Sequence, residues 1–325
     1  PAGPPEPAGP PRPARPGAPI LTLEGRAAPG LFLVGWLATI VGLGIGAIGL
    51  FASDSGVRPI ILLAGLTILG LGLVAGAGSQ AIERRARSAP FTGPSPILAF
   101  AASVPLTLVL GSLLGGPLEW FGLDPSSPAG ALLGVAVTAG VSIGVVRLLV
   151  VGTGALRWSE MGLRRRGPGI AEDAALGVAV ALPVLALAAL LAVLLSAFLA
   201  VPDAPLPLAG DPLGRLLNLL SAAVIAPISE EIFFRGYATT AWERGVGRKG
   251  AIVRSALFFA LVHVLTVGGA TFDEAVQRAV FAFVIRMPVG VGLAWIFLSR
   301  RSLYASIALH AVYNGLPLAL VFAAG

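Results

Sequence analysis

The sequence predicts an all-α polytopic protein that crosses a membrane many times. Of its 325 residues, 56% are hydrophobic and only 12% are charged, whereas an ordinary soluble domain carries about 25% charged residues. The mean hydropathy is +0.90, and one water-soluble core of this length could not bury so much apolar surface. Cysteine is absent, which excludes a disulfide framework, a thiolate nucleophile and a thiolate metal site.

Long apolar stretches give the expected membrane-spanning helices, since one crossing needs about 20 predominantly apolar residues. Five early stretches contain no charged residue, and four later ones contain histidine, glutamate or arginine. Glycine-rich runs in the first two stretches have the small-residue spacing that lets helices pack closely in lipid. We therefore expect nine crossings, at residues 27–53, 59–82, 94–118, 129–146, 174–201, 213–234, 251–269, 275–298 and 303–322.

Composition divides the chain into three parts. Residues 1–26 are rich in proline, alanine and glycine and predict a disordered cytoplasmic tail. Residues 27–201 predict a membrane region of five helices. Residues 202–325 contain the spans with ionisable side chains and are therefore the expected functional core.

Basic residues gather in alternate loops, which predicts how the chain is oriented. One set of loops holds almost all of them: Arg84, Arg85, Arg87, Arg157, Arg164, Arg165, Arg166, Arg244, Arg248, Lys249, Arg254, Arg300 and Arg301. Since cytoplasmic loops carry the excess of Lys and Arg, we expect the N-terminus in the cytoplasm. The same bias explains the net charge of +6, so no nucleic-acid partner is expected.

Both histidines of the chain fall inside predicted spans, where ionisable groups are costly and usually functional. His263 lies nine residues beyond Arg254, and His310 nine residues beyond Arg301. At 1.5 Å per residue, both imidazoles are expected roughly 13 Å below the basic end of their helices. Glu230, near the basic end of another span, can reach the same depth.

The two adjacent glutamates are expected to have different roles. Glu231 and Arg235 are four residues apart and therefore share a helix face, which predicts an ion pair. Glu230 is rotated by about 100° from Glu231, so it is the carboxylate expected to face the histidines.

The other pairs that share a face complete a hydrolytic site. Phe259 precedes His263 by four residues, and Asn314 follows His310 by four. A carboxylate and an imidazole can take a proton from water, and a second imidazole and an amide can hold an oxyanion. A zinc ion bound by Glu230, His263 and His310 is the alternative, and the sequence leaves the choice between them open.

Motifs of other membrane proteases are absent, including H-E-x-x-H, whereas three segments carry a resemblance. "EEIFFR" at 230–235, "FALVH" at 259–263 and "HAVYN" at 310–314 resemble the motifs E-E-x-x-x-R, F-x-x-x-H and H-x-x-x-N of the CPBP family. This is the family of CAAX proteases and bacteriocin-processing proteins, also called Abi. The resemblance covers residues 213–316.

The resemblance implies an intramembrane endopeptidase of glutamate or metallo type, without a certain cofactor. In the family, the first glutamate and the second-motif histidine are taken to activate water, and the third-motif histidine and asparagine to form an oxyanion site. This assigns catalysis to Glu230, His263, His310 and Asn314. The supporting residues are Glu231, Arg235 and Phe259.

The expected partners are the lipid bilayer and a membrane-embedded or lipid-anchored peptide or protein substrate, and the expected location is the cytoplasmic membrane of a bacterium. Two other functions stay open. A transporter could use Glu230 and Arg286 in a substrate path, and a non-catalytic immunity or scaffold protein would not need His310. Arg286, deep in the eighth span, is expected to pair with an acid such as Glu231, with substrate carboxylate binding as the alternative.

Overall fold

The computed structural model describes residues 22–163, 169–204 and 206–324, and these contain helices but no strand. The expected tail at 1–26 therefore lies mostly outside the described residues. The α-helices are α1 (Pro29–Phe51), α2 (Val57–Ala86), α3 (Pro96–Trp120), α4 (Pro128–Val146), α5 (Gly169–Ser196), α6 (Pro212–Leu220), α7 (Ala226–Glu231), α8 (Thr240–Val262), α9 (Phe272–Arg300) and α10 (Leu303–Ala324). Three π-helical segments are inserted between them: η1 (Arg147–Val151), η2 (Ser221–Ile225) and η3 (Ile232–Thr239). The all-α membrane class is confirmed.

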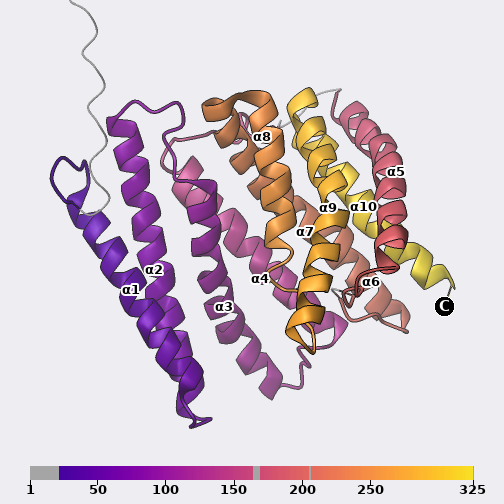
Figure 1. Ribbon diagram of the computed structural model, residues 1–325, viewed down its shortest axis with the longest axis horizontal. Helices are drawn as coiled ribbons and strands as arrows, with labels where there is room; N and C mark the ends of the chain where they lie inside the picture. The colour runs from indigo at the N-terminus through magenta and orange to yellow at the C-terminus, as the bar shows by residue number, and fades with distance from the viewer. Residues whose placement is uncertain (1–21, 164–168, 205, 325) are drawn as a thin grey trace, which may run out of the picture.

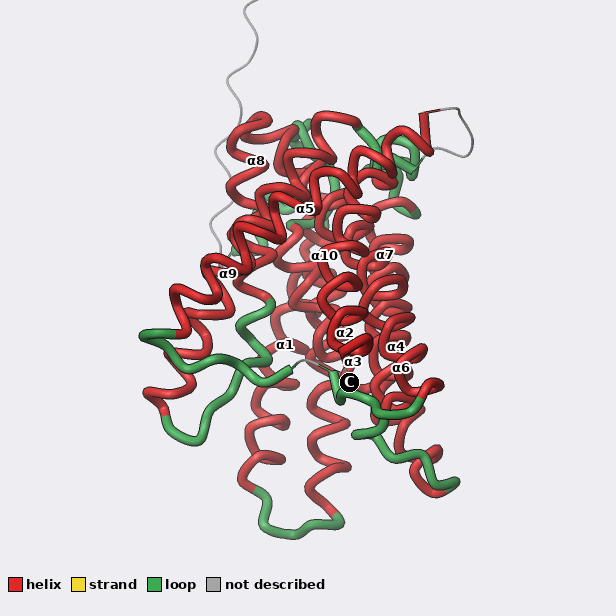
Figure 2. The backbone as a smooth tube through the Cα atoms, turned by 90° about the vertical axis from the view of Figure 1, so that its right-hand side faces the viewer, coloured by secondary structure: helices red, strands yellow, loops and turns green. Residues whose placement is uncertain are grey.

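The helices form one bundle in which the N-terminal hairpin lies at an edge. α1 and α2 stand beside α3 on one side, and α5, α9 and α10 lie on the other (Figure 1). The loop between α1 and α2 extends beyond the other helices at one end of the bundle (Figure 2). The hairpin is thus an addition at the edge of the bundle, far from α10.

Glycines bring the backbones of α1 and α2 into direct contact. A Cβ atom on Gly42 would lie 2.3 Å from the backbone nitrogen of Leu69, and one on Gly65 would lie 2.5 Å from that of Gly46. Side-chain rotation cannot relieve a clash with backbone. The glycine-rich runs therefore serve close helix packing.

Replacing Gly42 with leucine should force α1 away from α2. We expect a destabilisation of about 1–3 kcal/mol, as for other overpacked cores, measured by thermal unfolding of the detergent-solubilised protein. Gly44→Leu is the matched control, because nothing lies within 4 Å of a Cβ at this position of the same helix. Equal unfolding temperatures for the two variants would contradict the packing argument.

Eight helices among the described residues are long and apolar enough to cross a membrane, and one of them is folded in two. The helical stretch 212–262 has 51 residues, which would measure about 77 Å if it were straight. It breaks at Gly247, whose φ is +72° and ψ is +175°. This left-handed φ is one that glycine adopts without steric strain.

The chain returns alongside itself after this break. The hydroxyl of Ser255 donates to that of Thr239 at 2.8 Å, and the rings of Phe234 and Phe259 lie 5.3 Å apart. The segment before Gly247 is called the first leg and the segment after it the second leg. The two antiparallel legs correspond to the predicted spans 213–234 and 251–269. The total of nine crossings and the side of the N-terminus stay predictions.

Several of the basic loops meet at one end of the bundle. Arg85 donates to the carbonyl of Thr153, and Arg244 pairs with Glu160 at 2.6 Å. The helix end near Arg301 is joined to the first leg by an ion pair with Glu243 (Arg301 Nη2 to Oε1, 2.7 Å). The loops that carry most of the Arg and Lys residues therefore share one side, as the predicted alternation requires.

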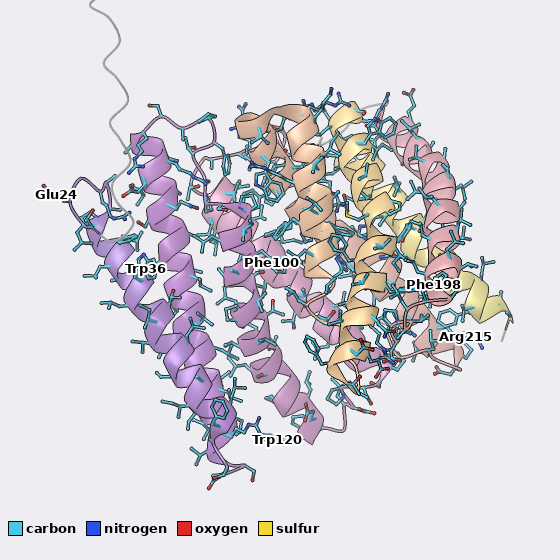
Figure 3. The ribbon with its side chains drawn as sticks, viewed as in Figure 1. Glu24, Trp36, Phe100, Trp120, Phe198 and Arg215 are labelled. Carbon is cyan, nitrogen blue, oxygen red and sulfur yellow. The ribbon has the colours of Figure 1, made fainter. Side chains whose placement is uncertain are left out.

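Large aromatic side chains project outward at the opposite helix ends. Trp120 at the end of α3 is 87% exposed, Phe198 just after α5 is 83% exposed and Phe272 at the start of α9 is 86% exposed. Figure 3 shows Trp120 and Phe198 on the outside of the bundle. Aromatic residues at this position are typical of a membrane–water interface.

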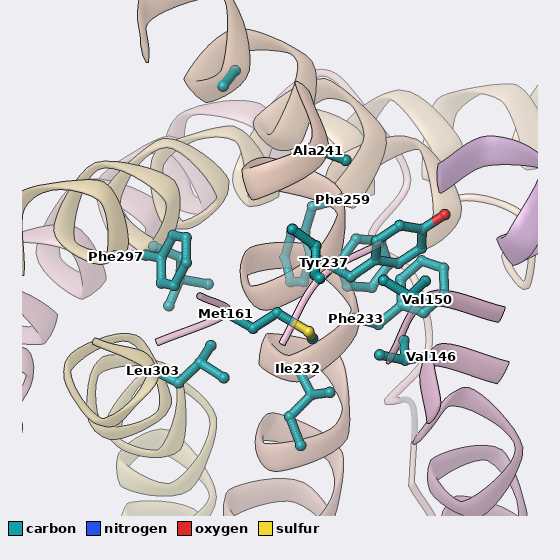
Figure 4. Packing of buried hydrophobic residues seen from close by; sticks show 14 of the residues in the cluster. Val146, Val150, Met161, Ile232, Phe233, Tyr237, Ala241, Phe259, Phe297 and Leu303 are labelled. Atoms are coloured by element: carbon teal, nitrogen blue, oxygen red, sulfur yellow. The ribbon is translucent and has the colours of Figure 1, made fainter. Parts of the chain in front are cut away.

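The loop that follows η1 is part of the core. Met161, in the basic loop that begins at Arg157, and Leu156 just before this loop are fully buried, and residues 164–168 lie outside the described residues. Met161 projects between Ile232 and Tyr237 of the first leg and Phe297 of α9 (Figure 4). This loop therefore fixes the first leg against α9.

α5 packs on the C-terminal helices, although it belongs to the predicted N-terminal region. Asp173 of α5 is fully buried and pairs with Arg300 of α9 at 2.7 Å. The backbone nitrogen of Ala200, just after α5, donates to Gln277 of α9 at 3.1 Å. The regions 27–201 and 202–325 thus share a packed interface, and the boundary between them stays a prediction.

Candidate active site

Three predicted site residues converge from three helical segments. Glu230 lies on the first leg, His263 at the end of the second leg and His310 on α10. Glu230 Oε2 is 3.6 Å from His263 Nε2 and 3.8 Å from His310 Nε2. The turn at Gly247 is what brings Glu230 and His263 face to face, because along a straight helix they would be about 50 Å apart.

Irregular helix geometry surrounds Glu230. It belongs to α7, a piece of only 6 residues that lies between the π-helical segments η2 and η3. Pro227 in the first turn of α7 has no N–H to donate. In η3, the hydroxyl of Thr239 donates to the carbonyl of Phe234, five residues back, at 2.8 Å. Such π-bulges are rare and often mark functional sites.

Each imidazole is held through its Nδ1 atom. His263 Nδ1 lies 2.7 Å from the carbonyl oxygen of Phe259, and His310 Nδ1 lies 2.8 Å from Glu231 Oε1. Carbonyl and carboxylate oxygens accept hydrogen bonds, so both Nδ1 atoms carry the proton and donate. Both Nε2 atoms are therefore turned toward Glu230.

Glu231 and Arg235 form a fully buried ion pair behind the site. Arg235 Nη1 is 2.9 Å from Glu231 Oε1, and both side chains are 0% exposed. The guanidinium also lies 4.3 Å from the ring centre of Phe259, which gives a cation–π contact. The Glu231–Arg235 pair is the one that the i, i+4 spacing predicts.

Glu231 has a second contact that the sequence analysis missed. The same Oε1 atom that accepts from Arg235 also accepts from His310 Nδ1. The helix-face argument separates the roles of Glu230 and Glu231 but cannot place a residue of another helix. Glu231 thus links the buried cation to the imidazole of α10.

Exposure separates an open part of the site from a closed part. The side chains of Glu230 and His263 are 28% and 26% exposed, whereas those of His310 and Glu231 are 3% and 0% exposed. Glu230 Oε2 is itself buried and accepts no hydrogen bond within the described part of the chain, so the exposed part of this side chain lies on its other atoms. Glu230 and His263 are the pair that water can reach.

Phe259 walls the site, as its spacing predicts. Its ring centre lies 4.4 Å from that of His263 and 5.6 Å from that of His310. The ring is 2% exposed. It therefore separates the buried Arg235 from the open face of the imidazoles.

Asn314 is placed apart from this cluster. Its Nδ2 donates to the carbonyl of Ala222 in η2 at 3.0 Å, and no hydrogen bond joins it to Glu230, His263 or His310 within the described residues. Its role in an oxyanion site stays a prediction.

The side chains as placed do not fit a metal ion. Among the described residues, no group of three or more His, Cys, Asp or Glu side chains is arranged to hold one. This includes the predicted set of Glu230, His263 and His310, and the choice between a metal-free and a metal-dependent site stays a prediction.

The structure corrects the expectation for Arg286 on α9. No ion pair joins it to Glu231 or to another acid in the described part of the chain; instead, its Nη1 donates to the carbonyl of Ala282, one turn earlier, at 3.0 Å. Glu231 Oε1 accepts from Arg235 and His310, and Glu231 Oε2 is buried without a hydrogen-bond partner among the described residues. Arg286 is therefore a cation in the bundle without a carboxylate partner.

A multi-pass helical membrane protein that gathers a carboxylate and two imidazoles at one depth belongs to the class of candidate membrane hydrolases. Residues 212–316 match the family model described as type II CAAX prenyl endopeptidase Rce1-like. Residues 212–316 thus form a domain of the CAAX-protease, or CPBP, type, as the three motifs predict. The match runs from α6 into α10 and contains every residue of the cluster. It makes the chain a multi-pass membrane protein with a membrane-protease domain.

No curated protein matches the chain, and no solved structure does.

Proposed function

We propose that the protein is an intramembrane endopeptidase that hydrolyses peptide bonds of membrane-embedded or lipid-anchored substrates with a water activated by Glu230 and His263. The observation that carries this proposal is the 3.6 Å contact between Glu230 Oε2 and His263 Nε2. The side chains of Glu230 and His263 are partly exposed. Those of Glu231, Arg235 and His310, which lie behind them, are buried. A carboxylate and an imidazole at this distance are a general acid–base pair within reach of one water molecule.

The proton moves between the water and this pair. As the water oxygen bonds to the scissile carbonyl carbon, one proton of the water passes to the pair formed by Glu230 and His263 Nε2. The tetrahedral intermediate then breaks its C–N bond, and the same proton passes to the leaving amine. His263 keeps its orientation throughout because its Nδ1–H is held by the carbonyl of Phe259.

The buried groups hold this pair in place. Arg235 fixes Glu231, Glu231 fixes His310, and His310 Nε2 lies against Glu230 Oε2. Groups that are already oriented need no rearrangement when charge develops, which is a large part of enzymatic rate enhancement. His310, Glu231 and Arg235 are thus positioning residues in this proposal.

The lipid-facing bundle and its basic end support the proposed setting. We place the protein in the cytoplasmic membrane of a bacterium, with the basic loops in the cytoplasm. The family description names prenylated CAAX substrates, so a lipid-anchored peptide is the first probe to use.

The test is a cleavage assay with the full chain reconstituted in liposomes. Two internally quenched peptides serve as probes, one attached to a farnesylated cysteine and one to a transmembrane helix. We expect cleavage of at least one probe, with mass spectrometry showing new termini at a single internal bond. Solute uptake without any peptide product would favour the carrier interpretation and contradict the proposal.

A metal chelator should leave the rate unchanged. We expect 1,10-phenanthroline to alter the cleavage rate by less than about twofold, because the water is activated by side chains alone. A zinc metalloprotease assayed in the same liposomes is the positive control. Loss of activity that added zinc restores would contradict the metal-free mechanism.

A further inference from the structure

We propose that Arg286 binds the oxyanion that forms on the scissile carbonyl, and is therefore a catalytic residue of this site. The inference rests on the proposed endopeptidase function and adds a group that the three motifs do not contain. Three observations support it: the depth of Arg286 in the bundle, the absence of a carboxylate partner for it among the described residues, and the hydrogen bonds that His310 and Asn314 already make.

Arg286 lies at the level of Glu230. The first leg and α9 run in the same direction, since both reach the basic end, where Glu243 pairs with Arg301. Lower down, Arg235 Nη2 lies 3.5 Å from the carbonyl oxygen of Gly290, so the first leg and α9 are also in contact near the site. Glu230 lies 13 residues before Glu243, and Arg286 lies 15 residues before Arg301, so the backbones of Glu230 and Arg286 lie at about the same depth.

Neighbouring contacts agree with this depth. Tyr313 follows His310 by one turn on α10, and its hydroxyl donates to the carbonyl of Ile285 at 3.4 Å. The turn of α9 that carries Arg286 is thus fixed against the turn of α10 next to His310.

Most N–H groups of the Arg286 guanidinium form no hydrogen bond among the described residues. It carries five N–H groups, and one hydrogen bond to Ala282 is found for it within the described residues. The side chain is only partly buried, so its remaining donors are not all enclosed by protein. A half-buried cation with reachable donors and no carboxylate partner is suited to an anionic oxygen.

The donors that the sequence predicts for this task are engaged elsewhere. His310 is 3% exposed and has a carboxylate at each ring nitrogen. Asn314 uses one of its two amide hydrogens for the carbonyl of Ala222. By contrast, an oxyanion forms within about 5 Å of the attacking water, because the reacting atoms start roughly 3–3.5 Å apart. A cation in the layer of Glu230 and His263 is placed to stabilise it.

Arg286 gives up no proton in the hydrolytic step. The water oxygen bonds to the carbonyl carbon, the carbonyl π electrons move to its oxygen, and the guanidinium holds the resulting negative charge. When the C–N bond breaks, these electrons return to the carbonyl and the amine receives the proton from Glu230 and His263.

The test is the kinetics of Arg286→Gln and Arg286→Lys with the quenched probe that the wild type cleaves. Removing one oxyanion donor costs about 100-fold or more in kcat, so we expect that loss for the glutamine variant with little change in KM. The lysine variant, which keeps the charge, should lose about tenfold. Arg278→Gln, which removes a paired cation two turns away on α9, is the matched control and should retain its kcat.

A second measurement distinguishes a loss of catalysis from a loss of folded protein. Added guanidinium at millimolar concentration should restore part of the rate of Arg286→Ala, which a merely structural residue would not allow. Unchanged kcat in Arg286→Gln would overturn the inference. A loss confined to KM, which disappears when the C-terminus of the probe is amidated, would show a carboxylate site instead and also overturn it. If the wild type cleaves neither probe, the proposed function itself fails.

Discussion

Glu230→Gln should abolish proteolysis while leaving the protein folded. The substitution keeps the shape of the side chain but removes the charge that draws a proton from water. General acid–base groups contribute about 10²–10⁴-fold to rates, so we expect a fall of about 1000-fold in kcat with the farnesylated or transmembrane probe. His263→Gln should give a loss of similar size, because His263 Nε2 acts on the same water.

The size of this effect depends on the local geometry rather than on charge in general. Glu172→Gln, which removes an exposed carboxylate from the first turn of α5, is the matched control and should keep wild-type activity. Since Glu230 Oε2 has no hydrogen-bond partner among the described residues, its neutralisation should barely change the unfolding temperature. Full activity of Glu230→Gln would rule out the proposed mechanism.

The apolar pattern and the spacing of a few polar residues predicted much of this architecture. Membrane helices follow from long apolar stretches because lipid requires internally paired backbone, and such stretches are visible in sequence. The Glu231–Arg235 pair follows from i, i+4 spacing. Even the common depth of Glu230, His263 and His310 could be counted in residues from the basic helix ends.

Other features depend on contacts between helices and could not be predicted. Nothing in the spacing shows that His310 Nδ1 reaches Glu231, because this contact depends on how α10 is rotated against the first leg. The two π-helical segments beside α7 change that rotation, and no sequence rule predicts them. Likewise, the pairing expected for Arg286 with Glu231 is absent from the described residues, where Glu231 pairs with Arg235 and His310 and Arg286 donates to Ala282.

The contribution of the Glu231–Arg235 ion pair to stability could not be predicted from the sequence either. A charge on Arg235 at 0% exposure is tolerated in the bundle only because Glu231 neutralises it and the ring of Phe259 faces it. The sequence shows two opposite charges one turn apart, as on many exposed helices, where such a pair contributes only about 0.3–0.5 kcal/mol. Burial is what changes its importance.

Glu231→Leu should therefore destabilise the protein strongly. It leaves Arg235 as an uncompensated buried charge, and breaking a buried pair in this way costs about 3–5 kcal/mol. The measurement is thermal or denaturant unfolding in detergent, followed by the fluorescence of the native tryptophans. His310 also loses the acceptor of its Nδ1–H, so activity should fall even in the fraction that remains folded.

The double variant Glu231→Leu/Arg235→Met separates charge from packing. Replacing both members of a buried pair with apolar groups is often neutral in stability, so the double variant should recover most of what the single variant loses. Its activity should nevertheless stay low, because His310 has no carboxylate to orient it. Stability would thus return without catalysis, which is the result expected if the pair serves to position His310 against Glu230. Recovery of both would show instead that the ion pair has no part in the chemistry.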